Sequence, residues 1–85
     1  MKTRPAHPIL TAASLGRILQ SARKSKALNQ TQLSARVGVS QARLSALERE
    51  PGTISVDQLL AMCSNLGLEL TISPKDTNAA PATDW

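Results

Sequence analysis

The stretch that decides the fold is Asn29–Glu48, NQTQLSARVGVSQARLSALE. It contains two runs of helix-forming residues separated by Gly38, and each run begins with a side chain that can cap a helix, Asn29 or Ser40. Gln32 stands three residues after Asn29, as in a capping box. Gly38 permits the positive φ that a sharp turn requires. The stretch is therefore predicted to form two short helices packed against each other across a tight turn.

The large apolar residues of this stretch are few and lie at helical spacing. They are Leu33, Val37, Val39, Leu44 and Leu47. So narrow a stripe is enough to hold the two helices together, and it leaves the first residues of the second helix facing outward. Two short helices joined by a turn of three or four residues are typical of a helix-turn-helix motif.

Two further helices are predicted to flank this pair. Thr11 can cap a helix that runs to about Lys26. Ser55 and Gln58 form a second capping box, which begins a helix that ends near Gly67. Pro51 and Gly52 end the preceding helix. The residues predicted to face inward from the two flanking helices are Leu15, Ile18, Leu19, Ala22, Leu59, Leu60, Cys63 and Leu66.

Composition limits the class of protein. The chain has 85 residues, 41% hydrophobic but only 1% aromatic, which favours one small all-α domain. The single cysteine, Cys63, can form neither an intramolecular disulfide nor a multi-cysteine metal site, so we expect a reducing, cytoplasmic location. We expect no metal, cofactor, small-molecule ligand or membrane partner. Enzyme activity is not expected either, because no nucleophile–base pair, paired carboxylates or phosphate-binding glycine loop is recognisable.

Charge is divided unequally along the chain. Residues 1–47 hold eight Lys or Arg and no acidic residue, whereas residues 48–85 hold two basic and six acidic residues. The first half is therefore predicted to face a polyanion. Small and hydrogen-bonding side chains at the start of the second helix of the motif suit entry into a DNA major groove. The predicted base-reading residues are Ser40, Gln41, Ala42, Arg43, Ser45 and Ala46, and the weaker candidates for phosphate contact are Arg17, Lys24 and Arg36.

The two ends of the chain are predicted to differ from the helical domain, 11–67. Residues 1–10, including His7, are expected to form a flexible arm, and the polar, Pro/Ala-rich residues 74–85 a disordered tail. Residues 68–73, LELTIS, alternate apolar Leu68, Leu70 and Ile72 with polar residues, which predicts a strand. Because no second strand is available, we expect it to pair with the same segment of a second copy.

Residues 28–48 resemble the phage-repressor and Cro type of helix-turn-helix, the xenobiotic-response-element family. The matching pattern is L-N-Q-T-Q-L-S-x-x-V-G-V-S-Q-x-x-L-S-x-L-E, and the resemblance covers about residues 12–67. It implies a lambda-repressor-like bundle, here of four helices plus a C-terminal strand that pairs across a dimer. It also implies that Gln30 contacts phosphate and that Arg23 and Glu48 form a structural ion pair rather than contacting DNA.

The family's fifth helix has no counterpart here, and its replacement by a strand and a polar tail ending in Asp-Trp resembles the HipB-type antitoxins. That resemblance implies a homodimer that represses its own operon by binding palindromic, double-stranded operator DNA. It also implies that the dimer sequesters a HipA-type serine/threonine kinase toxin.

Alternatives remain at this point. The chain could be a free-standing phage or metabolic transcriptional regulator without a toxin partner, or an adaptor that binds only protein. Trp85 has three interpretations: an incidental chain end, an apolar anchor for a partner or dimer groove, or part of a degradation signal.

Overall fold

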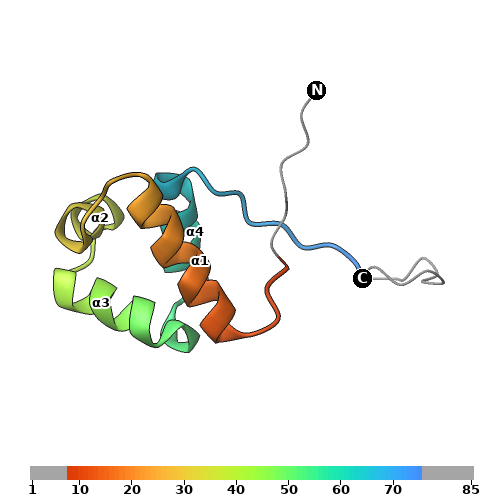
Figure 1. The fold of residues 1–85 in the computed structure, drawn as a ribbon. Coiled ribbons are helices and arrows are strands. Elements are labelled where there is room, and N and C mark those ends of the chain that lie inside the picture. Colours follow the sequence, from red (N-terminus) through yellow and green to blue (C-terminus); the bar gives the residue numbers. More distant parts are fainter. Residues whose placement is uncertain (1–7, 76–85) are drawn as a thin grey trace, which may run out of the picture.

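A computed structural model describes residues 8–75, and within that range every regular element is a helix. The order is α1 (Ala12–Ser25), α2 (Gln30–Val37), α3 (Gln41–Arg49), the 3-10 helix η1 (Pro51–Thr53) and α4 (Val56–Leu66). Figure 1 shows α1 crossing the middle of the bundle, with residues 68–75 running away from the helices. The four predicted α-helices are confirmed, and η1 is an additional turn at the predicted stop, Pro51.

Each predicted cap begins its helix. The hydroxyl oxygens of Thr11 and Ser40 accept hydrogen bonds from the backbone N–H groups three residues later. Asn29 and Ser55 each form a full capping box with the glutamine three residues on. These contacts satisfy N–H groups that would otherwise lack partners in the first turn of a helix. The helix starts are thus determined by local side chains.

A residue in the left-handed region follows three of the helices. Gly38 has φ 86° and Gly67 has φ 71°, which is the conformation that glycine adopts without strain. Ala27 has φ 56° after α1, although it carries a Cβ. There, the N–H of Leu28 donates to the carbonyl of Arg23 at 3.2 Å, and the N–H of Ala27 to the carbonyl of Lys24 at 3.0 Å. These bonds hold Ala27 in its strained conformation.

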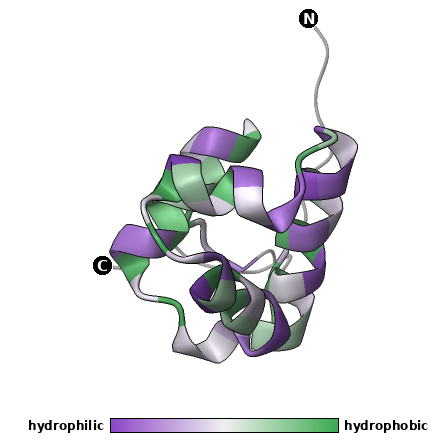
Figure 2. Ribbon diagram, turned by 90° about the vertical axis from the view of Figure 1, so that its left-hand side faces the viewer, coloured by the Kyte–Doolittle hydropathy of each residue, from purple (hydrophilic) through white to green (hydrophobic). Residues whose placement is uncertain are grey.

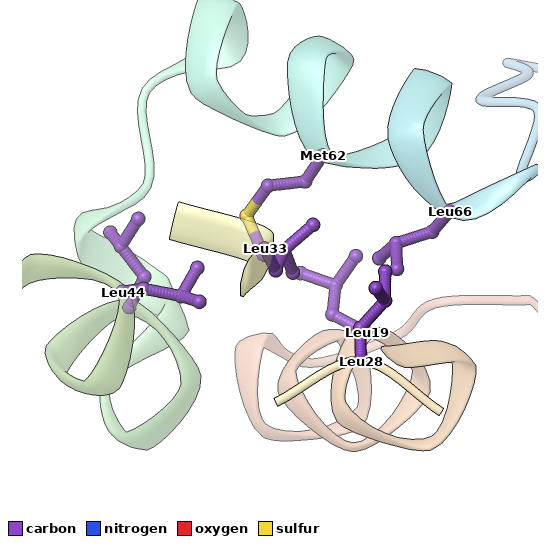
Figure 3. Packing of buried hydrophobic residues seen from close by; sticks show 7 residues of the cluster. Leu19, Leu28, Leu33, Leu44, Met62 and Leu66 are labelled. Atoms are coloured by element: carbon purple, nitrogen blue, oxygen red, sulfur yellow. The ribbon is translucent and has the colours of Figure 1, made fainter. Parts of the chain in front are cut away.

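The core is aliphatic and draws on every α-helix. Figure 2 shows hydrophobic and hydrophilic residues sharing each helix, and Figure 3 shows the hydrophobic side chains meeting at the centre. The cluster consists of Leu19, Leu28, Leu33, Leu44, Leu47, Met62 and Leu66. Burial of apolar surface contributes roughly 25 cal/mol per Å². The domain is thus stabilised by a compact set of leucines and one methionine.

One helix face was predicted wrongly. Leu60 was expected to be buried but is 48% exposed, whereas Met62, not predicted to face inward, is fully buried. The inward stripe of α4 follows Leu59, Met62, Cys63 and Leu66, and Leu60 lies one residue, about 100°, around the helix from Leu59. Cys63 is buried as predicted, and burial raises the pKa of its thiol.

Gly16 brings α1 close to the end of α3. A Cβ built at this position would lie 2.8 Å from Cγ of Pro51 and 3.1 Å from the carbonyl oxygen of Glu48. These distances are shorter than ordinary van der Waals contact, so only glycine fits without a shift of its neighbours. Gly16 therefore fixes how closely α1 approaches α3 and η1.

The predicted strand over residues 68–73 is not a strand in the single chain. The N–H of Leu68 closes α4 by donating to the carbonyl of Cys63 at 2.8 Å, and residues 69–75 are exposed and irregular. Leu70 and Ile72 are 38% and 91% exposed. The physical reason is that a strand requires a partner backbone, and residues 8–75 contain no other extended segment that pairs with it.

Some predictions concern residues outside the described range. Residues 1–7, including His7, and residues 76–85, including Trp85, belong to this group, so the arm and most of the tail stay predictions. Among the residues that are described, no helix is long and apolar enough to cross a membrane.

Candidate nucleic-acid interface

The first turn of α3 is the most open part of the motif. Ser40, Gln41 and Ala42 are exposed at the start of α3, whereas Leu44 and Leu47 on its other side are fully buried. The remaining predicted base-reading residues, Arg43, Ser45 and Ala46, are half-buried. One side of α3 is therefore fixed in the core while its N-terminal end faces solvent.

A glutamine from α2 supports the exposed glutamine of α3. Gln30 and Gln41 are each the first residue of their helix, and Nε2 of Gln41 donates to Oε1 of Gln30 at 2.8 Å. Nε2 of Gln30 in turn donates to Oε1 of Glu48 at 3.1 Å. Gln30, predicted to contact phosphate, is thus half-buried between two side chains of α3. From Glu48, the series of hydrogen bonds continues into the interior of the domain.

At the inner end of this series of hydrogen bonds, Arg23 and Glu48 form an ion pair. Nε of Arg23 donates to Oε2 of Glu48 at 2.7 Å, and its Nη2 donates to Oε1 at 3.1 Å. The two side chains are only 9% and 4% exposed. Nη1 of Arg23 also donates to the carbonyl of Leu28 at 2.9 Å. The guanidinium therefore joins the end of α1 to the end of α3, as the family resemblance implies.

Arg43 is turned away from the open end of α3. Its Nη2 donates to the carbonyl of Thr53 at 3.1 Å and to Oε1 of Gln58 at 3.3 Å. Gln58 also accepts the N–H of Ser55 in the capping box of α4. In this structure, Arg43 therefore connects α3 to the start of α4, and contact with a base would require these bonds to be exchanged.

The basic candidates for phosphate contact are exposed. Arg17 and Lys24 lie two turns apart on α1, and Arg36 lies in the last turn of α2. Among residues 8–75, the Arg23–Glu48 pair is the only ion pair, so these three charges are not neutralised by a described acidic residue. Because no acidic residue precedes Glu48, the surface of α1 and α2 is positively charged.

Sequence reasoning did not find the contacts between Gln30, Gln41 and Glu48. Gln30 and Gln41 are 11 residues apart and meet only because the turn brings the starts of two helices together. The available signal was that each glutamine directly follows a helix cap. Within the described range, no group of three or more His, Cys, Asp or Glu could hold a metal ion.

Similar solved structures share this fold. One is a chain of a HipA-HipB-O2-O3 complex, with a TM-score of 0.76 and 20% identity, covering 84% of this chain and all of that one. A second, described as an MDT protein, gives the same values. A third, from a HipB-O1-O2 complex, has a TM-score of 0.73 and 20% identity, covering 81% of this chain and all of that one.

Sequence comparison identifies the family. No curated protein matches the chain. The helix-turn-helix family model, however, matches residues 19–72, which include α2, the turn, α3 and α4. This match covers more than half of the chain. The protein belongs to the helix-turn-helix family of the Cro/C1 type.

Proposed function

We propose that this protein is a sequence-specific DNA-binding transcriptional repressor that inserts the start of α3 into the major groove. The observation that carries the proposal is the exposed Gln41, supported by Gln30 while Leu44 and Leu47 anchor the helix behind it. A glutamine can pair with adenine through two hydrogen bonds, and small neighbours allow a helix to approach base edges. Ser40, Ala42, Ser45 and Ala46 supply such neighbours.

Phosphate contacts would hold the domain in register on the duplex. Arg17, Lys24 and Arg36 are exposed and basic, as that role requires. Only one N–H of the Gln30 side chain is used in a described contact, so its second N–H is available for a phosphate at the start of α2. Lysine and arginine contacts of this kind make affinity fall with salt.

In vitro selection from a random duplex library tests this function. We expect wild-type protein to enrich an inverted repeat. Gln41→Ala should lose about 1–3 kcal/mol on that site and relax the preference at one base pair. Arg36→Ala should weaken all duplexes similarly and reduce the salt dependence. Failure of the wild-type protein to enrich any sequence would contradict sequence-specific binding.

We further propose that the protein is a HipB-type antitoxin that acts as a homodimer. Support comes from the fold shared with chains of HipA-HipB-O2-O3 and HipB-O1-O2 complexes, and from the exposed apolar residues beyond α4. Leu68, Leu70 and Ile72 could complete a strand when a second copy supplies the partner backbone. Two α3 helices would then enter successive major grooves about 34–36 Å apart.

Purification of the protein from its native operon tests the partner. Co-purification of a HipA-type serine/threonine kinase would support the antitoxin role. Binding to operator DNA without any such partner, and without a kinase-like gene beside its own, would instead indicate a free-standing regulator. Binding to protein but to no DNA would indicate an adaptor.

A further inference from the structure

We propose that the buried carboxylate of Glu48 sets the base preference of Gln41, from the opposite end of α3 and without touching DNA. The inference rests on the proposed DNA-binding function and concerns its specificity. Four side chains carry it, in the order Arg23, Glu48, Gln30, Gln41, which are connected by hydrogen bonds of 2.7–3.1 Å. Glu48 is a positioning residue in this arrangement.

The donor-to-acceptor direction of these hydrogen bonds follows from the chemistry of Glu48. An ionised carboxylate only accepts hydrogen bonds, so Gln30 must turn its Nε2 toward Oε1 of Glu48. The carbonyl end of the Gln30 amide then faces Gln41, which must donate through its own Nε2. The amide orientations of both glutamines are thus determined by a group that cannot donate.

This direction decides what Gln41 offers to a base. One N–H of Gln41 is used by Gln30, so one N–H and the carbonyl oxygen Oε1 remain. A donor beside an acceptor matches the major-groove edge of adenine, which presents N7 as an acceptor and N6 as a donor. Guanine presents two acceptors, N7 and O6, and would require two donors. The fixed direction therefore favours adenine over guanine.

Glu48→Gln removes the constraint with little change in shape. Either orientation of the new amide places its NH2 group against one donor of Arg23, so neither orientation keeps both bonds to the guanidinium. When the amide nitrogen faces Gln30, that glutamine reverses, and Gln41 must then accept, leaving two N–H groups for the base. Both directions become available, and the discrimination between adenine and guanine is lost.

The experiment uses the full chain and the duplex enriched by in vitro selection. Gln41→Ala identifies the base pair that Gln41 reads, and duplexes with adenine or guanine at that position are competed against each other. We expect wild type to prefer adenine and Glu48→Gln to lose about tenfold of that preference. Glu50→Gln is the matched control, because Glu50 is exposed and its loss changes the net charge equally. Both affinities come from one preparation, so any unfolded fraction cancels in their ratio.

Gln30→Met completes a double-mutant cycle, because it cuts the connection while keeping Arg23 and Glu48 paired. Adding Glu48→Gln to this variant should change the adenine-to-guanine ratio no further. A second measurement needs no DNA and applies even if no duplex is selected. The side-chain amide resonances of Gln41 in a ¹H–¹⁵N spectrum should shift in Glu48→Gln and Gln30→Met but not in Glu50→Gln.

The results that overturn the inference differ from those that overturn the function. Guanine at the position read by Gln41, or an unchanged ratio in Glu48→Gln, would refute the role of Glu48 while leaving DNA binding intact. Unmoved Gln41 resonances in Glu48→Gln would refute it as well. Absence of any enriched duplex for wild type would instead refute the proposed function.

Discussion

The side chains of Arg23, Glu48, Gln30 and Gln41, which come from three helices, are connected by hydrogen bonds. Residues 69–75, by contrast, make no hydrogen bond within the described part of the chain. Both regions contain exposed residues, but they differ in how their partners are provided. In the helix-turn-helix, the hydrogen-bond partners come from the same chain, so the exposed side chain of Gln41 is already oriented by Gln30. The segment after α4 leaves Leu70 and Ile72 exposed, and its backbone has no partner among residues 8–75. The orientation of Gln41 is thus determined within one copy, whereas the proposed pairing of residues 68–73 would require a second copy.

The largest effect should come from breaking the interior of the first region. Glu48→Ala leaves the guanidinium of Arg23 buried without its partner, and loss of one member of such a pair costs about 3–5 kcal/mol. That is a large part of the stability of a domain of this size. We expect urea unfolding followed by circular dichroism to show a much lower midpoint. Glu50→Ala, at an exposed position in the same turn, should change the unfolding free energy by less than about 0.5 kcal/mol.

Gly16→Ala should have the next largest effect, because it disturbs the packing that supports the first region from outside the motif. The added methyl group meets the ring of Pro51 and a backbone oxygen, neither of which can rotate away. Overpacking of this kind costs about 1–3 kcal/mol. Gly52→Ala is the control, since a Cβ there would lie 3.8 Å from Cβ of Ala12, an ordinary contact. Equal thermal midpoints for the two variants would contradict the close approach.

Smaller effects of opposite sign are expected at two helix ends. Gly38→Ala places a Cβ in open space, so its cost is that of the left-handed conformation, about 1 kcal/mol, less the freedom that the unfolded chain loses, which leaves a destabilisation of about 0.5 kcal/mol. Ala27 already bears this cost at φ 56°, so Ala27→Gly should stabilise the domain by about 0.5 kcal/mol after the added freedom of the unfolded chain is subtracted. Thermal unfolding of both variants measures the contrast. Destabilisation by Ala27→Gly would show that Ala27 is not strained.

The smallest effect on stability should come from the second region. Ile72→Asp changes a side chain that is 91% exposed, so the unfolding free energy of the helical domain should change by less than about 0.5 kcal/mol. If residues 68–73 pair between two copies, however, the two copies bring like negative charges to the interface, and their repulsion should weaken the dimer by tenfold or more. Analytical ultracentrifugation measures the dimer, and Lys75→Asp, beyond the predicted strand, is the control. An unchanged dimer would contradict pairing through this segment.

Local signals in the sequence were sufficient to predict the helices. Each helix start is determined by a side chain that hydrogen-bonds to the backbone of its own helix: Thr11, Asn29, Ser40 and Ser55. These starts can therefore be predicted from the sequence without knowledge of tertiary contacts. The left-handed conformation of Ala27, two residues after the end of α1, was less accessible, because it depends on backbone carbonyls of α1 rather than on the residue type. The exposure of Leu60 depended on which face of α4 meets the other helices.

The site was only partly accessible to sequence reasoning. The open turn of α3 followed from the narrow apolar stripe, and the pairing of Arg23 with Glu48 came from the family pattern. The placement of Arg43 against Thr53 and Gln58 could not be predicted, because it depends on how η1 and α4 return past α3. The contact of Gln30 with Gln41 was hidden for a similar reason, since it requires the geometry of the turn.

The contact at Gly16 also limits how DNA affinity could be regulated. The backbone of α1 rests there against the rigid ring of Pro51 and the last part of α3, so α3 cannot tilt relative to α1 without separating them. Each copy would then behave as one stiff body on DNA. If two copies bind DNA together as proposed, a partner that alters DNA affinity would act by changing the spacing or the relative rotation of two such bodies, rather than by reshaping α3.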